Sequence, residues 1–93
     1  MSEKLTPREI AELKARAHSL NPVVMIGQHG LTESVIKETD AALKAHELIK
    51  VRVLGDDRQE RIAICETLCS AVDAQLVQHI GKLLVLWREN TED

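Results

Sequence analysis

Two glycines enclose a short polar loop in the stretch VMIGQHGLT, residues 24–32. Gly27 and Gly30 are separated only by Gln28 and His29, so a ligand could approach the backbone closely. Backbone N–H groups favour an anion, and the second glycine can adopt a positive φ that a side chain would penalise. If a strand precedes this loop and a helix follows it, the helix dipole strengthens the same preference. The residues therefore predict a phosphate site, for a nucleotide or for a nucleic-acid backbone.

The spacing of the glycines distinguishes between kinds of phosphate site. A P-loop needs a longer loop that ends in Gly-Lys-Ser/Thr, and a dinucleotide fingerprint needs Gly-x-Gly-x-x-Gly, and the sequence contains neither. A bare Gly-x-x-Gly between strand and helix is typical of KH-type RNA modules, which hold a nucleic-acid backbone there. Because four residues often match by chance, a turn that simply requires glycines is the alternative explanation.

Hydrophobic periodicity and capping residues predict the elements that position this loop. Apolar residues at helical spacing predict three helices, with caps at Thr6 and Thr32 and a turn over 55–57 that leads to the cap of the third. Short β-branched or alternating segments predict four strands. We expect a helix from Pro7 to about His18 or Leu20, a strand over 23–26, a helix from Thr32 to His46 and Glu47, a strand over 48–54, a helix from Asp57 to Val72, and strands over 75–80 and 83–88 joined by a Gly81-Lys82 hairpin turn.

The expected order is α-β-α-β-α-β-β, which predicts an α/β fold with a mixed four-stranded sheet. The first two strands should run parallel, joined by a right-handed crossover, with the KH-like glycine loop between the first strand and the second helix. At 93 residues the chain has room for one hydrophobic core. We expect a single compact domain over residues 1–93 with an ordered core at about 5–88.

Three separated blocks of the chain resemble the CRM domain family (chloroplast RNA splicing and ribosome maturation), in particular its small stand-alone bacterial members, the YhbY-like proteins. The blocks are LKARAHSLNPVVMIGQHGLTESV, ALKAHELIKVRV and IGKLLVLWR, in the family's order, and the resemblance extends from Leu5 to Arg88. It implies an RNA-binding domain similar to KH modules and to the carboxyl-terminal domain of a bacterial translation initiation factor. Because the stand-alone members associate with precursors of the large ribosomal subunit, it also implies a ribosome assembly factor that binds ribosomal RNA.

The resemblance places the family's glycine loop on residues 27–30. Family loops often hold a lysine where this chain has Gln28 and His29, so the permanent charge is absent. His29 could donate a hydrogen bond to a phosphate, stack on a base, or simply face solvent. Lys50 and Arg52 share one face of their strand, where they either extend a basic track from the loop or form an ordinary solvated face. The expected RNA-binding residues are Gly27, Gln28, His29, Gly30, Thr32, Lys14, Lys50, Arg52 and Lys82.

The sequence offers no catalytic constellation. Cys65 and Cys69 lie four residues apart, but both belong to an apolar helical stripe, so we expect buried thiols and not a metal pair. The histidines are scattered over separate elements, and we expect no enzyme, no metal and no cofactor. Trp87 is the sole aromatic residue, which excludes RNA reading by several stacked aromatics and favours recognition of backbone and shape.

Composition bounds the remaining possibilities. The longest apolar run is too short to cross a bilayer, the amino terminus does not resemble a signal peptide, and the two cysteines lack disulfide-like spacing. We therefore expect a cytoplasmic monomer that does not bind membranes. The formal net charge is −3, so any anion site must be local. The acidic balance fits an alternative function better, a protein-interaction module that docks on a ribosomal protein or another assembly factor.

Overall fold

The computed structural model describes residues 5–90, and residues 1–4 and 91–93 of the expected domain lie outside this range. The element order is the one predicted from the sequence. The elements are α1 (Pro7–Ala17), β1 (Val24–Ile26), α2 (Glu33–His46), β2 (Leu48–Val53), α3 (Arg58–Val72), β3 (Gln75–Ile80) and β4 (Leu83–Trp87).

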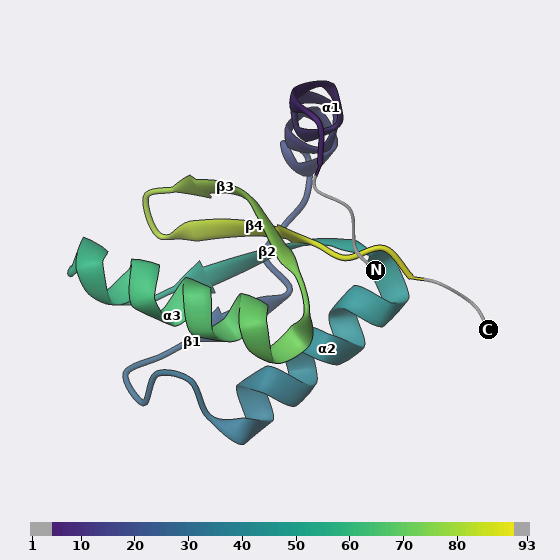
Figure 1. Ribbon diagram of the computed structural model, residues 1–93. Helices are drawn as coiled ribbons and strands as arrows, with labels where there is room; N and C mark the ends of the chain where they lie inside the picture. Colours follow the sequence, from purple (N-terminus) through teal and green to yellow (C-terminus); the bar gives the residue numbers. More distant parts are fainter. Residues whose placement is uncertain (1–4, 91–93) are drawn as a thin grey trace.

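The four strands form one mixed sheet, as expected (Figure 1). The strand order is β1-β2-β4-β3, with β1 parallel to β2 and both other pairs antiparallel. One large hydrophobic cluster joins α2 and α3 to one face of the sheet, and a smaller cluster joins α1 to the other face. The sheet is therefore the middle of three layers, with α2 and α3 on one face and α1 on the other.

Capping residues set the start of each helix at the position predicted. Thr6 and Glu9 form a reciprocal capping box, and the side chains of Thr32 and Asp57 accept hydrogen bonds from the first turns of α2 and α3. β3 has the expected bounds, β1 begins one residue later than expected, and β2 and β4 each end one residue earlier. Leu54 and Arg88 still donate backbone hydrogen bonds, to Ile26 and Glu47 respectively, but the chain is already leaving the ladder there.

Strand β2 shows the predicted alternation between buried and wet side chains. Ile49, Val51 and Val53 are at most 1% exposed and face α2 and α3, whereas Lys50 is half-buried and Arg52 is exposed. Trp87 is half-buried in the smaller cluster, packed with α1, which agrees with a packing role. None of the helices within residues 5–90 is long and apolar enough to span a bilayer.

Candidate nucleic-acid interface

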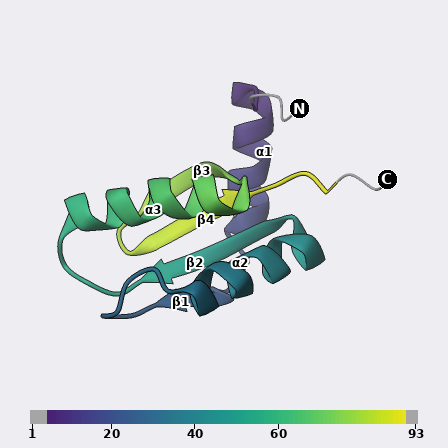
Figure 2. The same ribbon diagram turned by 60° about the horizontal axis from the view of Figure 1, so that its bottom comes forward.

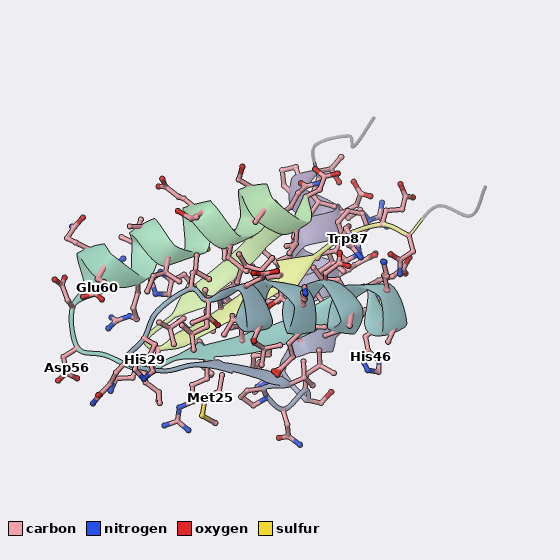
Figure 3. The ribbon with its side chains drawn as sticks, turned by 90° about the horizontal axis from the view of Figure 1, so that it is seen from below. Met25, His29, His46, Asp56, Glu60 and Trp87 are labelled. Atoms are coloured by element: carbon pink, nitrogen blue, oxygen red, sulfur yellow. The ribbon has the colours of Figure 1, made fainter. Side chains whose placement is uncertain are left out.

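The glycine loop lies where β1 ends and α2 begins. Because β1 and β2 are parallel, their carboxyl ends meet at the same edge of the sheet. The loop over 27–32, the start of α3 and the β3–β4 turn gather at this edge (Figure 2), which we call the loop edge. Figure 3 shows His29, Asp56 and Glu60 toward the loop edge, with His46 and Trp87 toward the opposite end of the sheet.

The two glycines of the loop differ in what they require. The backbone N–H of Gly30 donates to the carbonyl of Gly27 at 3.0 Å, and Gly30 has a φ of +69°, a conformation that side chains rarely adopt. Gly27 does not have a positive φ, and a Cβ added to it would meet no atom within 4 Å. Backbone geometry therefore explains the glycine at position 30 but not the one at position 27.

The amino end of α2 adds unpaired backbone N–H groups beside the loop. The hydroxyl oxygen of Thr32 accepts a hydrogen bond from the backbone of Val35 at 3.2 Å. The backbone N–H groups that precede Val35 in the first turn have no intrahelical partner and point out of the helix. Glu33 adds a negative charge to this turn, and Lys37 partly neutralises it at 3.4 Å. The helix end is therefore suited to one anion, with its dipole partly opposed by Glu33.

Two of the predicted basic residues lie at or beside the loop edge. The carbonyl of Lys82 accepts a hydrogen bond from Val53 at 2.7 Å, so the hairpin turn is fixed against the end of β2. The ammonium of Lys82 lies 3.3 Å from Asp56 in an exposed ion pair. Arg52 precedes Val53, is exposed, and forms no ion pair within residues 5–90.

Arg61 is a further basic residue of this edge that we did not predict from the sequence. Its Nη1 donates to the carbonyl of Gly55 at 2.8 Å, and its Nε is buried with no hydrogen-bond partner among the described residues. A signal was present: Arg61 lies four residues before Cys65, in the buried stripe of α3 that continues through Leu68 and Val72. A charged side chain at a core position of a helix end indicates a group held for a purpose other than solubility.

Lys14 and Lys50 come together at a different place. Both line a shallow groove between α1 and the sheet, together with His18, Gln78, Ile80 and Val85. Lys50 lies three residues before Val53 on β2, and its side chain faces the α1 layer. The structure thus divides the predicted basic residues into a group near the loop and a group in this groove.

The cysteine pair is part of the core. The two sulfur atoms of Cys65 and Cys69 are 3.9 Å apart, and the pKa of the Cys69 thiol is raised because it shares a hydrogen bond with Cys65 and is partly buried. The same hydrogen bond lowers the pKa of the Cys65 thiol, but Cys65 is only 4% exposed, and a thiol with a raised pKa such as Cys69 is a poor nucleophile at neutral pH. Within residues 5–90, no three His, Cys, Asp or Glu side chains gather in a way that could hold a metal ion.

Comparison with known proteins agrees with the predicted resemblance. The family model for the CRS1 / YhbY (CRM) domain matches residues 5–88. An RNA-binding protein of Haemophilus influenzae is 47% identical over 88 residues, which cover 95% of this chain and 89% of that protein. A probable RNA-binding protein of Pseudomonas aeruginosa is 40% identical over 86 residues, covering 92% and 83%.

A solved structure shares the fold as well as the sequence pattern. The solution structure of a hypothetical Staphylococcus aureus protein, thought to bind RNA, superposes with a TM-score of 0.83 at 38% identity, covering 97% of this chain and 94% of that one. The Haemophilus relative is named an RNA-binding protein and the Pseudomonas relative a probable one. The chain therefore belongs to the CRS1 / YhbY (CRM) domain family.

Proposed function

We propose that this protein binds RNA through the loop over 27–30 and the start of α2, and that its target is ribosomal RNA in precursors of the large subunit. RNA binding is supported by the names of its relatives. The ribosomal target rests on the resemblance to the stand-alone bacterial members of the family. In this role the protein acts as a ribosome assembly factor, and not as an enzyme.

The observation that carries the proposal is the open space at Gly27. Neither the conformation nor the packing of the chain requires a glycine there, since a Cβ would meet nothing within 4 Å. An RNA phosphate, by contrast, gains from the absence of a side chain because it can then approach the backbone N–H groups directly. Gln28 and His29 are exposed and lie beside this approach.

Basic side chains around the loop supply the attraction that the loop itself lacks. Arg52, Lys82 and Arg61 lie on β2, in the hairpin turn and in the first turn of α3, and all three elements reach the loop edge. Arg52 is exposed and forms no ion pair among the described residues, so its guanidinium has donors available to phosphate oxygens. Thr32 caps α2 through its oxygen, so its hydroxyl hydrogen is left to donate to a phosphate.

The test is fluorescence anisotropy of labelled large-subunit ribosomal RNA fragments over a salt series. The variant Gln28→Asp/His29→Asp places two negative charges in the loop, and we expect its affinity to fall about tenfold or more. The matched control is Ser19→Asp/Asn21→Asp, which makes the same charge change at exposed positions before β1, at the other end of that strand. We expect the control to bind nearly as well as the wild type.

Two outcomes would overturn the proposal. If the loop variant and the control lose affinity equally, the effect is one of net charge and the loop is not the contact. If the wild type fails to bind any large-subunit fragment at low salt, the loop does not bind this RNA and its glycines serve only the backbone turn. Circular dichroism and urea unfolding of each variant ensure that a loss of binding is not a loss of folding.

A further inference from the structure

Part of the sheet face on the α1 side is left uncovered. Helix α1 packs through Leu13 and Ala17 onto Leu48, Val77 and Val85, and so covers only the part of the face near those residues. Beyond it, one row of side chains crosses all four strands, because the strand register aligns Met25 with Arg52, Arg52 with Leu83, and Leu83 with Ile80.

This row is mostly apolar and accessible. Met25 is 57% exposed and Ile80 is 52% exposed, although both are large hydrophobic residues in strands. Leu83 between them is half-buried, and Arg52 interrupts the apolar surface with one positive charge. Figure 3 shows the side chain of Met25 pointing away from α3, out of the molecule. We call this row, together with the adjoining groove, the open sheet patch.

The groove gives the open sheet patch a positive border. Its polar lining consists of Lys14, His18, Lys50 and Gln78, and it contains no Asp or Glu. Within residues 5–90, the ammonium groups of Lys14 and Lys50 form no ion pair or hydrogen bond, whereas Lys37, Lys44 and Lys82 are each paired with a carboxylate. Unpaired cations beside exposed apolar groups, in a protein of net charge −3, are complementary to an acidic apolar surface.

We propose that the open sheet patch binds an acidic amphipathic helix of a protein partner. The row from Met25 to Ile80 crosses three strand spacings, roughly 14 Å, which a helix covers in about two and a half turns. Apolar side chains at helical spacing on the partner would cover Met25, Leu83 and Ile80. Carboxylates of the partner would pair with Arg52 within the row and with Lys14 and Lys50 along its border.

The composition of the patch favours a protein over a second RNA contact. RNA bases bind open sheet faces by stacking on aromatic rings, and Trp87, the one aromatic residue of the chain, is packed with α1. A phosphate backbone would use the cations but would leave Met25 and Ile80 uncovered. An amphipathic helix satisfies both the apolar and the charged parts. This binding shares Arg52 with the RNA contact at the loop edge, but its apolar residues and its Lys14 and Lys50 border are not part of that contact.

The proposal can be tested by NMR with a defined probe. The probe is a synthetic helical peptide of about 18 residues, or five turns, with a leucine stripe bordered by glutamates. A second peptide carries lysine in place of every glutamate. Amide shifts in ¹⁵N-labelled full-length protein report the site, and the titration gives Kd. We expect the glutamate peptide to shift Met25, Lys50, Arg52, Leu83 and Ile80, and to bind at least about tenfold more tightly than the lysine peptide.

Two variants and one control assign the binding to the patch. We expect Lys14→Glu/Lys50→Glu and Met25→Ser/Ile80→Ser each to weaken the glutamate peptide by about tenfold. The control Lys37→Glu/Lys44→Glu makes the same charge reversal on α2 and should leave Kd within about twofold. Urea unfolding verifies that every variant is folded.

Three results would overturn the proposal. The first is equal binding of the glutamate and lysine peptides, and the second is a set of shifts that lie outside the patch. The third is that a large-subunit RNA fragment, and not the peptide, shifts the amide signals of Lys14, Lys50 and Ile80, which lie outside the proposed RNA contact. RNA binding at the loop edge is measured separately with the Gln28→Asp/His29→Asp variant, so failure of either proposal can be recognised by itself.

Discussion

At the end of the sheet near the last turn of α2, polar side chains form hydrogen bonds within the protein. At the loop edge, several polar side chains form none among the described residues. Arg88 donates from Nη1 to Asp40 Oδ1 at 2.7 Å and to the carbonyl of Val72 at 2.9 Å. The side-chain amide of Asn90 donates to the carbonyls of Leu43 and Lys44, at 3.0 and 2.9 Å. These bonds join the segment after β4 to the ends of α2 and α3, and we call this region the tail end.

The loop edge contains the same kinds of groups in a different state. Among the described residues, the buried Nε of Arg61 has no partner and Arg52 forms no ion pair, and the Lys82–Asp56 pair is exposed. The contrast shows that the presence of an arginine or lysine does not by itself indicate a ligand contact in this domain. Arg88 at the tail end is only 15% exposed in its side chain and is used by the fold, whereas Arg52 at the loop edge is exposed and forms no ion pair among the described residues.

The largest expected effect on stability comes from removing the guanidinium of Arg88, which holds the tail end together. We expect Arg88→Leu to lower the free energy of unfolding by about 2 kcal/mol, because hydrogen bonds to charged groups are lost and Asp40 keeps no guanidinium partner. Urea unfolding measures the loss. RNA affinity of the folded variant should stay within about twofold of the wild type, and a larger drop would remove the distinction between the two ends.

The pH dependence of the same variant tests the cause of its instability. Arg88 donates a hydrogen bond to Asp40 and thereby lowers the pKa of that carboxyl below its usual value of 3.8. A carboxyl with a lowered folded-state pKa stabilises the fold fully above 3.8, and this contribution is lost as the pH falls through the folded value. The difference in stability between wild type and Arg88→Leu should therefore shrink below pH 3.8. A constant difference would show that the bond to Val72 carries the effect.

The elements of this fold could be predicted because they depend on local signals. Thr6, Thr32 and Asp57 are strong caps that act within one helical turn, and β2 alternates strictly because one of its faces is buried. The position of the glycine loop follows from the same elements. Predictions of this kind need only the spacing of neighbours along the chain.

The grouping of the polar residues could not be predicted in the same way. Arg88 and Asp40 are 48 positions apart, and their pairing depends on where β4 ends relative to α2. Lys14 and Lys50 share a groove because Leu13 and Ala17 place α1 over Val85 of β4. Such contacts depend on tertiary packing, so the sequence indicated which cations were available but not which of them would be paired.

A smaller effect is expected when each glycine of the loop is replaced by alanine. Gly30→Ala should lower the free energy of unfolding by about 1–2 kcal/mol, because alanine is strained at a φ of +69°. Gly27→Ala should change it by less than about 0.5 kcal/mol, since the position has space and no positive φ. Urea unfolding compares the two.

The glycine variant that changes stability less is expected to be the more informative about RNA affinity. Gly27→Ala is expected to weaken binding of large-subunit RNA fragments by about threefold or more, because the methyl group occupies the approach to the backbone. This variant is the more informative of the two, because it tests the ligand site with little disturbance of the fold. Unchanged affinity for folded Gly27→Ala would make the open space incidental.

The smallest effect on stability is expected when either of two exposed lysines, one at each end of the sheet, is replaced by glutamine. Lys82 lies 3.3 Å from Asp56 at the loop edge, and Lys44 lies 3.4 Å from Asp40 at the tail end. Both ion pairs are largely solvated, so Lys82→Gln and Lys44→Gln should each change the free energy of unfolding by less than about 0.5 kcal/mol. The pair is therefore a matched comparison of the same substitution in two places.

Salt dependence of RNA binding then separates the two lysines. A lysine that neutralises one phosphate contributes about one unit to the slope of log K against log salt. We expect Lys82→Gln to reduce that slope by about one unit and Lys44→Gln to leave it unchanged, as measured by anisotropy between low and moderate salt. Equal slopes for the two variants would mean that the hairpin turn does not reach the RNA, and would restrict the contact to residues 27–32 and the arginines beside them.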